Sequence, residues 1–74
     1  MWSKGTVEIN GTPVTWSVKH FDECSEYGID GGRISKMTIK IGTKDIVNYD
    51  RGWDIKPSDD ISIFAFKFLM EKFN

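Results

Sequence analysis

Residues 7–18, VEINGTPVTWSV, decide the fold. They place Asn10-Gly11, a dipeptide that favours the tight turn of a β-hairpin, between two segments in which apolar and polar residues alternate. Because successive side chains of a strand point to opposite faces, each segment gains one apolar face, made by Val7 and Ile9 before the turn and by Val14, Trp16 and Val18 after it. The pattern predicts antiparallel strands at residues 2–9 and 14–21.

The same alternation returns in residues 33–41, where Met37, Ile39 and Ile41 share a face. Residues 42–44 then predict a tight turn into a short fourth strand at about residues 45–50, and Gly52 is expected to end that strand. Connections this short favour a meander. We therefore predict an α+β fold, a four-stranded antiparallel sheet packed by one C-terminal helix, in a single domain of residues 1–74.

The predicted helix follows Pro57 and runs from about residue 59 to 73. Ser58 is expected to cap it, and the two aspartates after Ser58 complement the helix dipole. One apolar stripe is expected to cover the sheet: Ile61, Phe64, Ala65, Phe68 and Leu69. A second stripe lies on another side of the helix: Ile63, Phe66, Met70 and Phe73. Either a twisted sheet wraps around this second stripe, or the helix pairs in a homo-oligomer.

Composition excludes several classes of protein. A net charge of −1 argues against a nucleic-acid partner, since nucleic-acid-binding domains carry a basic excess. The single cysteine, Cys24, excludes an intramolecular disulfide framework and suits a reducing cytoplasm. The sequence has neither a secretory leader nor an apolar run of about 18 residues, so we expect no membrane partner and a cytoplasmic location.

A glycine-rich block at residues 25–36, SEYGIDGGRISK, and a second segment at residues 49–54, YDRGWD, hold both arginines of the chain. Glycines allow close backbone approach and an anion-binding nest of N–H groups, and arginine offers a planar fork to phosphate. Aromatic residues beside them can stack on a flat ligand, and aspartates can accept hydrogen bonds from a ribose or a base. The candidate ligand-binding residues are Lys19, His20, Tyr27, Asp30, Gly31, Gly32, Arg33, Ser35, Lys36, Tyr49, Asp50, Arg51 and Trp53. The alternative is that both segments are purely structural: the glycine-rich block is a loop, and the second segment is a corner of the chain fixed by packing and a salt bridge.

The polar face of the predicted sheet carries four lysines, Lys4, Lys19, Lys36 and Lys40, beside Thr6, Ser17 and Thr38. With Trp2 nearby, this face can stack a base and neutralise phosphate. Exposed lysines also keep strands soluble and discourage pairing at sheet edges. Both interpretations stay open at this point.

Catalytic signatures are absent from the sequence. His20, Asp22 and Cys24 are close along the chain, but their proximity in sequence does not establish a nucleophile and its base. No spacing typical of a zinc or calcium site occurs. We expect no enzyme, no cofactor and no metal.

Four segments, residues 19–22, 25–29, 31–36 and 49–53, resemble a family of short uncharacterised proteins from phages, prophages and Gram-positive bacteria. The pieces GGRISK and YDRGW carry most of the resemblance, which spans nearly the whole chain. The resemblance implies no chemistry. It does imply a context, because compact phage proteins often counter host defence by blocking a nuclease or by sequestering a nucleotide signal.

The sequence therefore predicts a small non-catalytic binding protein that captures an anionic, nucleotide-like molecule, such as a cyclic immune signal, in the host cytoplasm. The alternative is a protein-binding inhibitor of a bacterial defence system such as a CRISPR nuclease. Direct nucleic-acid binding ranks third.

Overall fold

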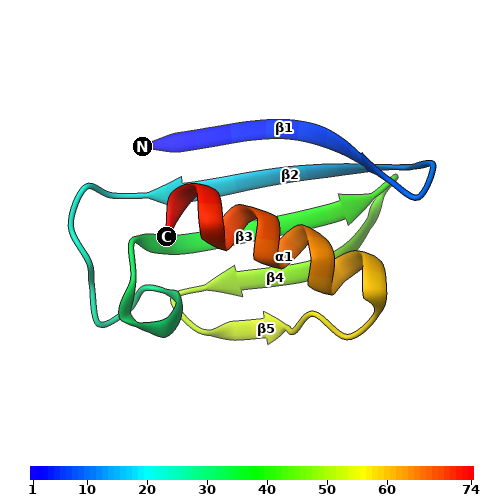
Figure 1. Cartoon of the computed structure of the whole chain (residues 1–74). Helices are drawn as coiled ribbons and strands as arrows, with labels where there is room; N and C mark the ends of the chain where they lie inside the picture. Colours follow the sequence, from blue (N-terminus) through cyan, green and yellow to red (C-terminus); the bar gives the residue numbers. More distant parts are fainter.

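The computed structural model describes residues 1–74 as one sheet and one helix (Figure 1). The strands are β1 (Trp2–Ile9), β2 (Thr12–His20), β3 (Ile34–Ile41), β4 (Lys44–Asp50) and β5 (Trp53–Ile55), and the helix is α1 (Asp60–Phe73). A short 3₁₀ turn, η1 (Ile29–Gly31), lies between β2 and β3. The sheet order is β1-β2-β3-β4-β5, with every neighbouring pair antiparallel. The predicted α+β class and C-terminal helix are confirmed.

The first hairpin forms around the Asn10-Gly11 turn. Both residues have positive φ, 51° for Asn10 and 79° for Gly11, as a two-residue hairpin turn requires. In the resulting register Val7 lies opposite Val14. This pairing places the apolar side chains of both strands on the same face of the sheet.

The sheet has five strands, so the predicted count of four was wrong. β4 ends at Asp50, and the chain reverses through Arg51, whose φ is 59°, and Gly52. Residues 53–55 then pair back on β4, with Trp53 opposite Tyr49. Three residues are too few to show a period of two. Gly52 does follow the end of the fourth strand, but it belongs to a turn that leads into a fifth one.

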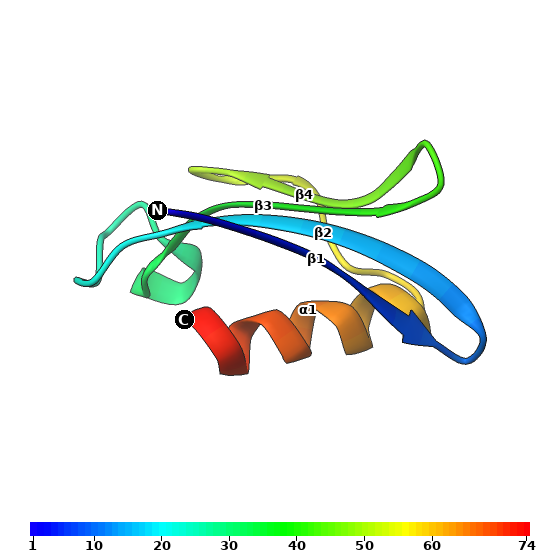
Figure 2. The same ribbon diagram turned by 90° about the horizontal axis from the view of Figure 1, so that it is seen from above.

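The core lies between α1 and the one face of the sheet that the helix covers (Figure 2). Val14, Val18, Met37, Ile39 and Val47 are fully buried there. On the helix, the buried positions are Ser62, Ala65 and Leu69.

The stripe of the helix that meets the sheet differs from the predicted one. Phe64 points to solvent with 59% of its surface exposed. Phe66 and Phe73 contact the sheet, with ring centroids 5.5 Å from those of Trp53 and Trp16 respectively. Small residues at positions 62 and 65 form the middle of the contact, which lets the helix approach the strands closely. Ala65 and Leu69 of the predicted stripe are buried in this contact, whereas Ser62, which is polar, was not part of that stripe.

The helix begins with a capping box at Asp59, and the predicted cap at Ser58 was wrong. The carboxylate of Asp59 accepts a hydrogen bond from the backbone N–H of Ser62 at 2.7 Å, and the hydroxyl of Ser62 accepts one from the N–H of Asp59 at 3.0 Å. The hydrogen bonds from the backbone N–H of Ser62, first, and from the side chain of Ser62, second, hold the pKa of Asp59 below its usual value. The stabilisation they give is complete above that usual value and is lost as the pH falls through the lowered pKa.

None of the helical segments is both long enough and apolar enough to cross a lipid bilayer.

We expect Ser62→Ala to lower the free energy of unfolding by about 1–3 kcal/mol, because the backbone N–H groups of Ser58 and Asp59 both lose their acceptor. Urea denaturation measures the change. Ser58→Ala is the matched control, and it should change stability by less than about 0.5 kcal/mol because its hydroxyl makes no hydrogen bond. Equal losses in the two variants would contradict the assignment of the cap.

Candidate functional site

The face of the sheet that points away from α1 is not covered by any other element (Figure 2). The strand register brings its side chains into rows that cross the sheet. One row runs through Trp2, Lys19, Lys36 and Asp50, and the next through Lys4, Ser17, Thr38 and Asn48. We call this surface the open face. Its lysines and hydroxyl groups lie where the alternation of the sequence predicts them.

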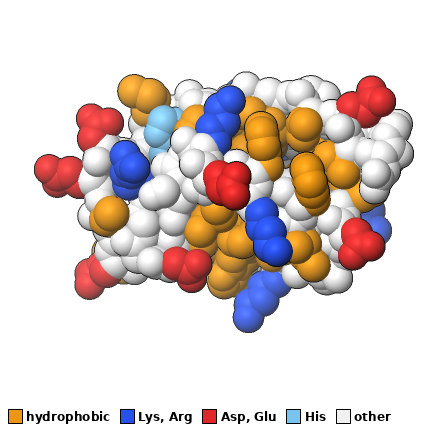
Figure 3. Space-filling view, in the orientation of Figure 1, with side chains coloured by type: hydrophobic (Ala, Val, Ile, Leu, Met, Phe, Trp, Pro, Cys, Tyr) orange, Lys and Arg blue, Asp and Glu red, His pale blue; other side chains and the backbone are white.

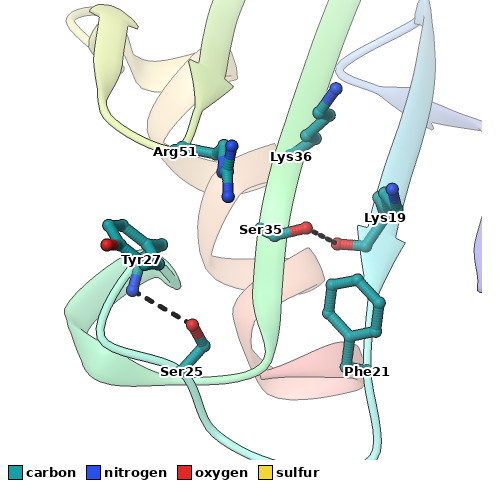
Figure 4. Close-up of a pocket in the computed structure, with 7 residues that line it drawn as sticks. All are labelled: Lys19, Phe21, Ser25, Tyr27, Ser35, Lys36 and Arg51. Atoms are coloured by element: carbon teal, nitrogen blue, oxygen red, sulfur yellow. Dashed lines mark hydrogen bonds between the residues drawn. The ribbon is translucent and has the colours of Figure 1, made fainter.

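A hollow of about 270 Å³ lies at the end of the open face, where β2 and β3 meet the loop of residues 21–33. Figure 4 shows the seven residues that line it: Lys19, Phe21, Ser25, Tyr27, Ser35, Lys36 and Arg51. α1 passes behind the strands in this view, so the hollow and the helix lie on opposite faces (Figure 4). We call it the first hollow.

The first hollow is strongly cationic. Lys36 is the one cation of the three with a carboxylate partner, since its Nζ lies 3.6 Å from an Oδ of Asp50, and an ion pair this exposed is weak. Lys19 and Arg51 form no ion pair. Each lies instead over an aromatic ring, Lys19 at 5.6 Å from the ring centroid of Phe21 and Arg51 at 5.2 Å from that of Tyr27. Their charges therefore stay available to an anion.

Arg51 is held in a costly backbone conformation. Its φ of 59° lies in the left-handed region, which side chains other than glycine, asparagine and aspartate seldom adopt. Its N–H donates a hydrogen bond to the carbonyl of Ser35 at 3.0 Å, which ties the turn between β4 and β5 to β3. The turn thereby carries the guanidinium to the rim of the hollow (Figure 4).

The glycine-rich block builds the loop and does not offer its N–H groups to a ligand. The N–H of Gly31 donates to the carbonyl of Gly28 at 3.0 Å, and that of Gly32 donates to Ile29 at 2.9 Å. A Cβ at Gly28 would collide with the carbonyl oxygen of Gly32, so this close approach requires glycine. The predicted anion-binding nest is therefore occupied by the loop's own carbonyl groups.

Two side chains from distant parts of the chain fix this loop. The hydroxyl of Tyr49 donates to the carbonyl of Tyr27 at 2.8 Å. The amide of Asn74 accepts from the N–H of Ile34 at 2.9 Å and donates to the carbonyl of Ile29 at 3.1 Å. Tyr27 is thereby positioned beside Arg51. No local sequence pattern indicates the part played by Asn74, because its partners lie 40 and 45 residues away along the chain.

The structure brings together five of the predicted ligand-binding residues: Lys19, Tyr27, Ser35, Lys36 and Arg51. Asp50 pairs with Lys36 beside them. Several others are not among the residues that line the hollow: Asp30, Gly31, Gly32 and Arg33. Tyr49 and Trp53 contact each other on the helix side, where Trp53 also meets Phe66. They support the fold there and do not face the hollow.

His20 also lies on the helix side. Its Nε2 is 2.9 Å from the hydroxyl of Ser3, and its ring stacks on Phe73 at 4.7 Å. Cys24 is exposed, and the hydrogen-bond partner of His20 is Ser3. No three histidine, cysteine or carboxylate side chains gather as metal ligands.

Sequence reasoning missed Phe21 and Ser25 as lining residues of the hollow. For Phe21 a signal existed, because it follows Ser17 and Lys19 in the same alternation and so belongs to the same face. For Ser25 there was none. It lies in an irregular loop whose path is set by tertiary hydrogen bonds.

Comparison with known proteins identifies the family of the chain. A family model described as a domain of unknown function (DUF7678) matches residues 1–74, and the chain belongs to this family. Neither the curated proteins nor the solved structures include a match. The chemistry of the site therefore has to be argued from its own residues.

We expect Asn74→Ala to loosen the loop of residues 21–33, because Ile34 N–H and Ile29 C=O both lose their partner, at a cost of about 1–3 kcal/mol. Amide hydrogen exchange at Ile34 should become faster than in the wild type. Asn74→Asp is the matched control, since it keeps the acceptor and loses the donor, and Ile34 should stay protected. Unchanged exchange in Asn74→Ala would show that the loop does not depend on this amide.

Proposed function

We propose that this member of the DUF7678 family is a non-catalytic binding protein that captures an anionic, nucleotide-like ligand in the first hollow. The observation that carries the proposal is the pairing of cations with rings. Lys19 and Arg51 each lie over an aromatic side chain and face no carboxylate. A nucleotide combines the two features that such a surface complements, a phosphate and a flat base.

In this proposal the phosphate lies among the ammonium groups of Lys19 and Lys36 and the guanidinium of Arg51. The guanidinium forms two parallel hydrogen bonds with phosphate oxygens, and the lysines act as point charges. The base stacks on Phe21 or Tyr27, whose rings are 46% and 52% exposed. A volume of about 270 Å³ suits a phosphate with one sugar and base better than a large cofactor.

The conformation of Arg51 supports a role other than stability. A left-handed arginine costs about 1–2 kcal/mol relative to a residue that adopts this region freely. The turn would tolerate glycine at no such cost. Strained residues cluster at functional sites, and here the strain aims the guanidinium at the hollow.

The biological context of the proposal comes from the GGRISK and YDRGW segments, which resemble proteins of phages, prophages and Gram-positive bacteria. We propose that the protein works in the host cytoplasm as a counter-defence sponge for a cyclic nucleotide signal. Sequestration needs tight binding and no turnover. We further propose a homo-oligomer, in which the exposed Ile63 and Phe64 of α1 are covered by another copy.

A second candidate function is supported by the outer surface of α1. Phe64 is 59% exposed and, with Lys67, Phe68 and Glu71, lines another hollow of about 270 Å³. The space-filling view in Figure 3 shows apolar side chains gathered over this side of the molecule. Such a patch suits a protein partner, and this candidate is an inhibitor of a defence protein such as a CRISPR nuclease.

The two arginines of the chain give a matched test of the ligand site. Arg51→Gly should abolish the rise in melting temperature that nucleotides cause, while the free protein keeps or gains stability because the left-handed strain is relieved. Arg33→Ala removes the same charge outside the first hollow and should leave ligand binding within about threefold of wild type. The measurement is thermal unfolding with mono-, di- and cyclic nucleotides and adenosine-diphosphate-ribose isomers. Loss of binding in Arg33→Ala alone would overturn the site.

The two candidate functions place their activity on opposite faces of the molecule. Plaque formation by a defence-sensitive phage on cells that carry a cyclic-nucleotide defence system and express each variant distinguishes them. A sponge should no longer protect the phage with Arg51→Gly and should still protect it with Phe64→Ser, because the first hollow is lined within one chain and does not need the proposed contact between copies. The reverse result would favour the protein-binding inhibitor, because Phe64 lies on the helix face away from the first hollow.

A further inference from the structure

We propose that the ligand is a short single strand of nucleic acid, bound along the open face through two neighbouring hollows. The inference rests on the proposed function for the first hollow and adds a second one, which nothing in the sequence singled out as a pocket. It names the class of ligand, a chain of nucleotides in place of one nucleotide.

The second hollow also measures about 270 Å³ and lies on the same open face. Its lining includes Lys4, Thr15, Ser17, Thr38 and Lys40. The strand register places it beside the first hollow, because the row of Lys4, Ser17 and Thr38 is adjacent to the row of Lys19 and Lys36. At about 3.3 Å per residue, Lys36 and Lys40 are about 13 Å apart along β3. A single nucleotide in the first hollow would leave the second one empty.

The cations of the open face follow one track. Lys4 is on β1, Lys19 is on β2, and Lys36 and Lys40 are on β3. Lys4 forms no ion pair, and Lys40 has only an exposed one, at 3.5 Å from Asp45. Three carboxylates of this face, Asp45, Asp50 and Asp54, belong to β4 and β5, and a fourth, Glu8, lies near the far end of β1. A phosphate backbone would therefore lie over β1, β2 and β3, away from the acidic side of the sheet.

Aromatic rings gather at one end of this track. Trp2 is 52% exposed and lies directly opposite Lys19 in the register, and Phe21 and Tyr27 line the first hollow beside it. Between the lysines the face offers hydroxyl and amide groups, such as Thr38, whose hydroxyl lies 3.1 Å from Asn48 Oδ1. Rings that stack on bases, combined with a cationic groove that follows the backbone, are the features by which proteins bind single strands.

A duplex does not suit this surface. Its bases are stacked inside, so the exposed rings would find no base to stack on. The face is also built from a sheet whose side chains are short between the lysines, and it presents no helix or two-stranded ribbon to enter a groove. The observations therefore favour a strand whose bases are already unstacked.

The test compares a six-nucleotide oligothymidylate labelled with fluorescein, measured by fluorescence anisotropy at several salt concentrations, with adenosine monophosphate, measured by thermal unfolding. Each phosphate contact to a single strand contributes about −0.7 to the slope of log K against log salt. Contacts from Lys4, Lys19, Lys36, Lys40 and Arg51 together give a slope of about −3.5. The variant with Lys4→Gln and Lys40→Gln should reduce it to about −2.1, weaken oligonucleotide binding at least about tenfold, and leave the mononucleotide unaffected.

A variant with Lys67→Gln and Lys72→Gln is the matched control, because it removes the same charge from α1. Trp2→Ala should weaken oligonucleotide binding by about 5- to 150-fold, the range found for stacking rings. The inference is overturned if the oligonucleotide binds no more tightly than the mononucleotide, if Lys4→Gln with Lys40→Gln binds it as wild type does, or if the duplex of the same length binds equally well. The proposed function survives those results as long as Arg51→Gly still loses the mononucleotide. If neither probe binds, both proposals fail.

Discussion

The structure depends on the contact of a single helix with one face of a five-stranded sheet. Ser62, Ala65 and Leu69 form the middle of this contact, opposite the fully buried side chains of β2, β3 and β4. The 74 residues form this sheet and this helix, and no other element packs on the opposite face of the sheet (Figure 2). The other face of the sheet must therefore remain in water unless a ligand or a partner covers it, and it carries the polar half of each alternating strand. The contact that stabilises the fold and the proposed ligand site therefore lie on opposite faces of the sheet.

The rim of the first hollow is built by long-range contacts. Tyr49 reaches the carbonyl of Tyr27, and Asn74 bridges two backbone groups of the same loop. Arg51 is fixed from the opposite side through its N–H bond to Ser35. The ring of Tyr27 and the guanidinium of Arg51 thus meet from separate segments, each ordered by the fold before any ligand arrives. Such preorganisation lowers the entropic cost of binding.

The net charge of the chain and the charges on the open face lead to different expectations about an anionic ligand. The chain as a whole has a net charge of −1, which disfavours an anionic partner. On the open face, however, the cations lie on β1, β2, β3 and the turn after β4, and the two carboxylates that pair with lysines there, Asp45 and Asp50, belong to β4. An anion responds to the potential of the surface it touches, since charges more than about 8–10 Å away are screened at physiological salt. An anionic ligand is therefore compatible with the cations of the open face, although the chain as a whole has a negative net charge.

The features that depend on residues close together in the sequence could be predicted from the sequence alone. The Asn10-Gly11 turn, the alternation in β1, β2 and β3, the position of α1 and the lysines of the open face all follow from residues within a few positions of one another. Five members of the first hollow were predicted for the same reason, since they belong to alternating strands or to the two arginine segments.

The remaining features depend on tertiary contacts. They include the strand β5, the helix cap at Asp59 in place of Ser58, and the exposure of Phe64 while Phe66 and Phe73 pack on the sheet. They also include the positions of the two arginines, since Arg51 lines the first hollow and Arg33 does not. The N–H groups of Gly31 and Gly32 donate to carbonyl groups of their own loop. Each of these outcomes depends on a contact between residues distant in sequence or on the competition of several local signals. A pattern of neighbours carries no information about which distant partner a side chain will meet.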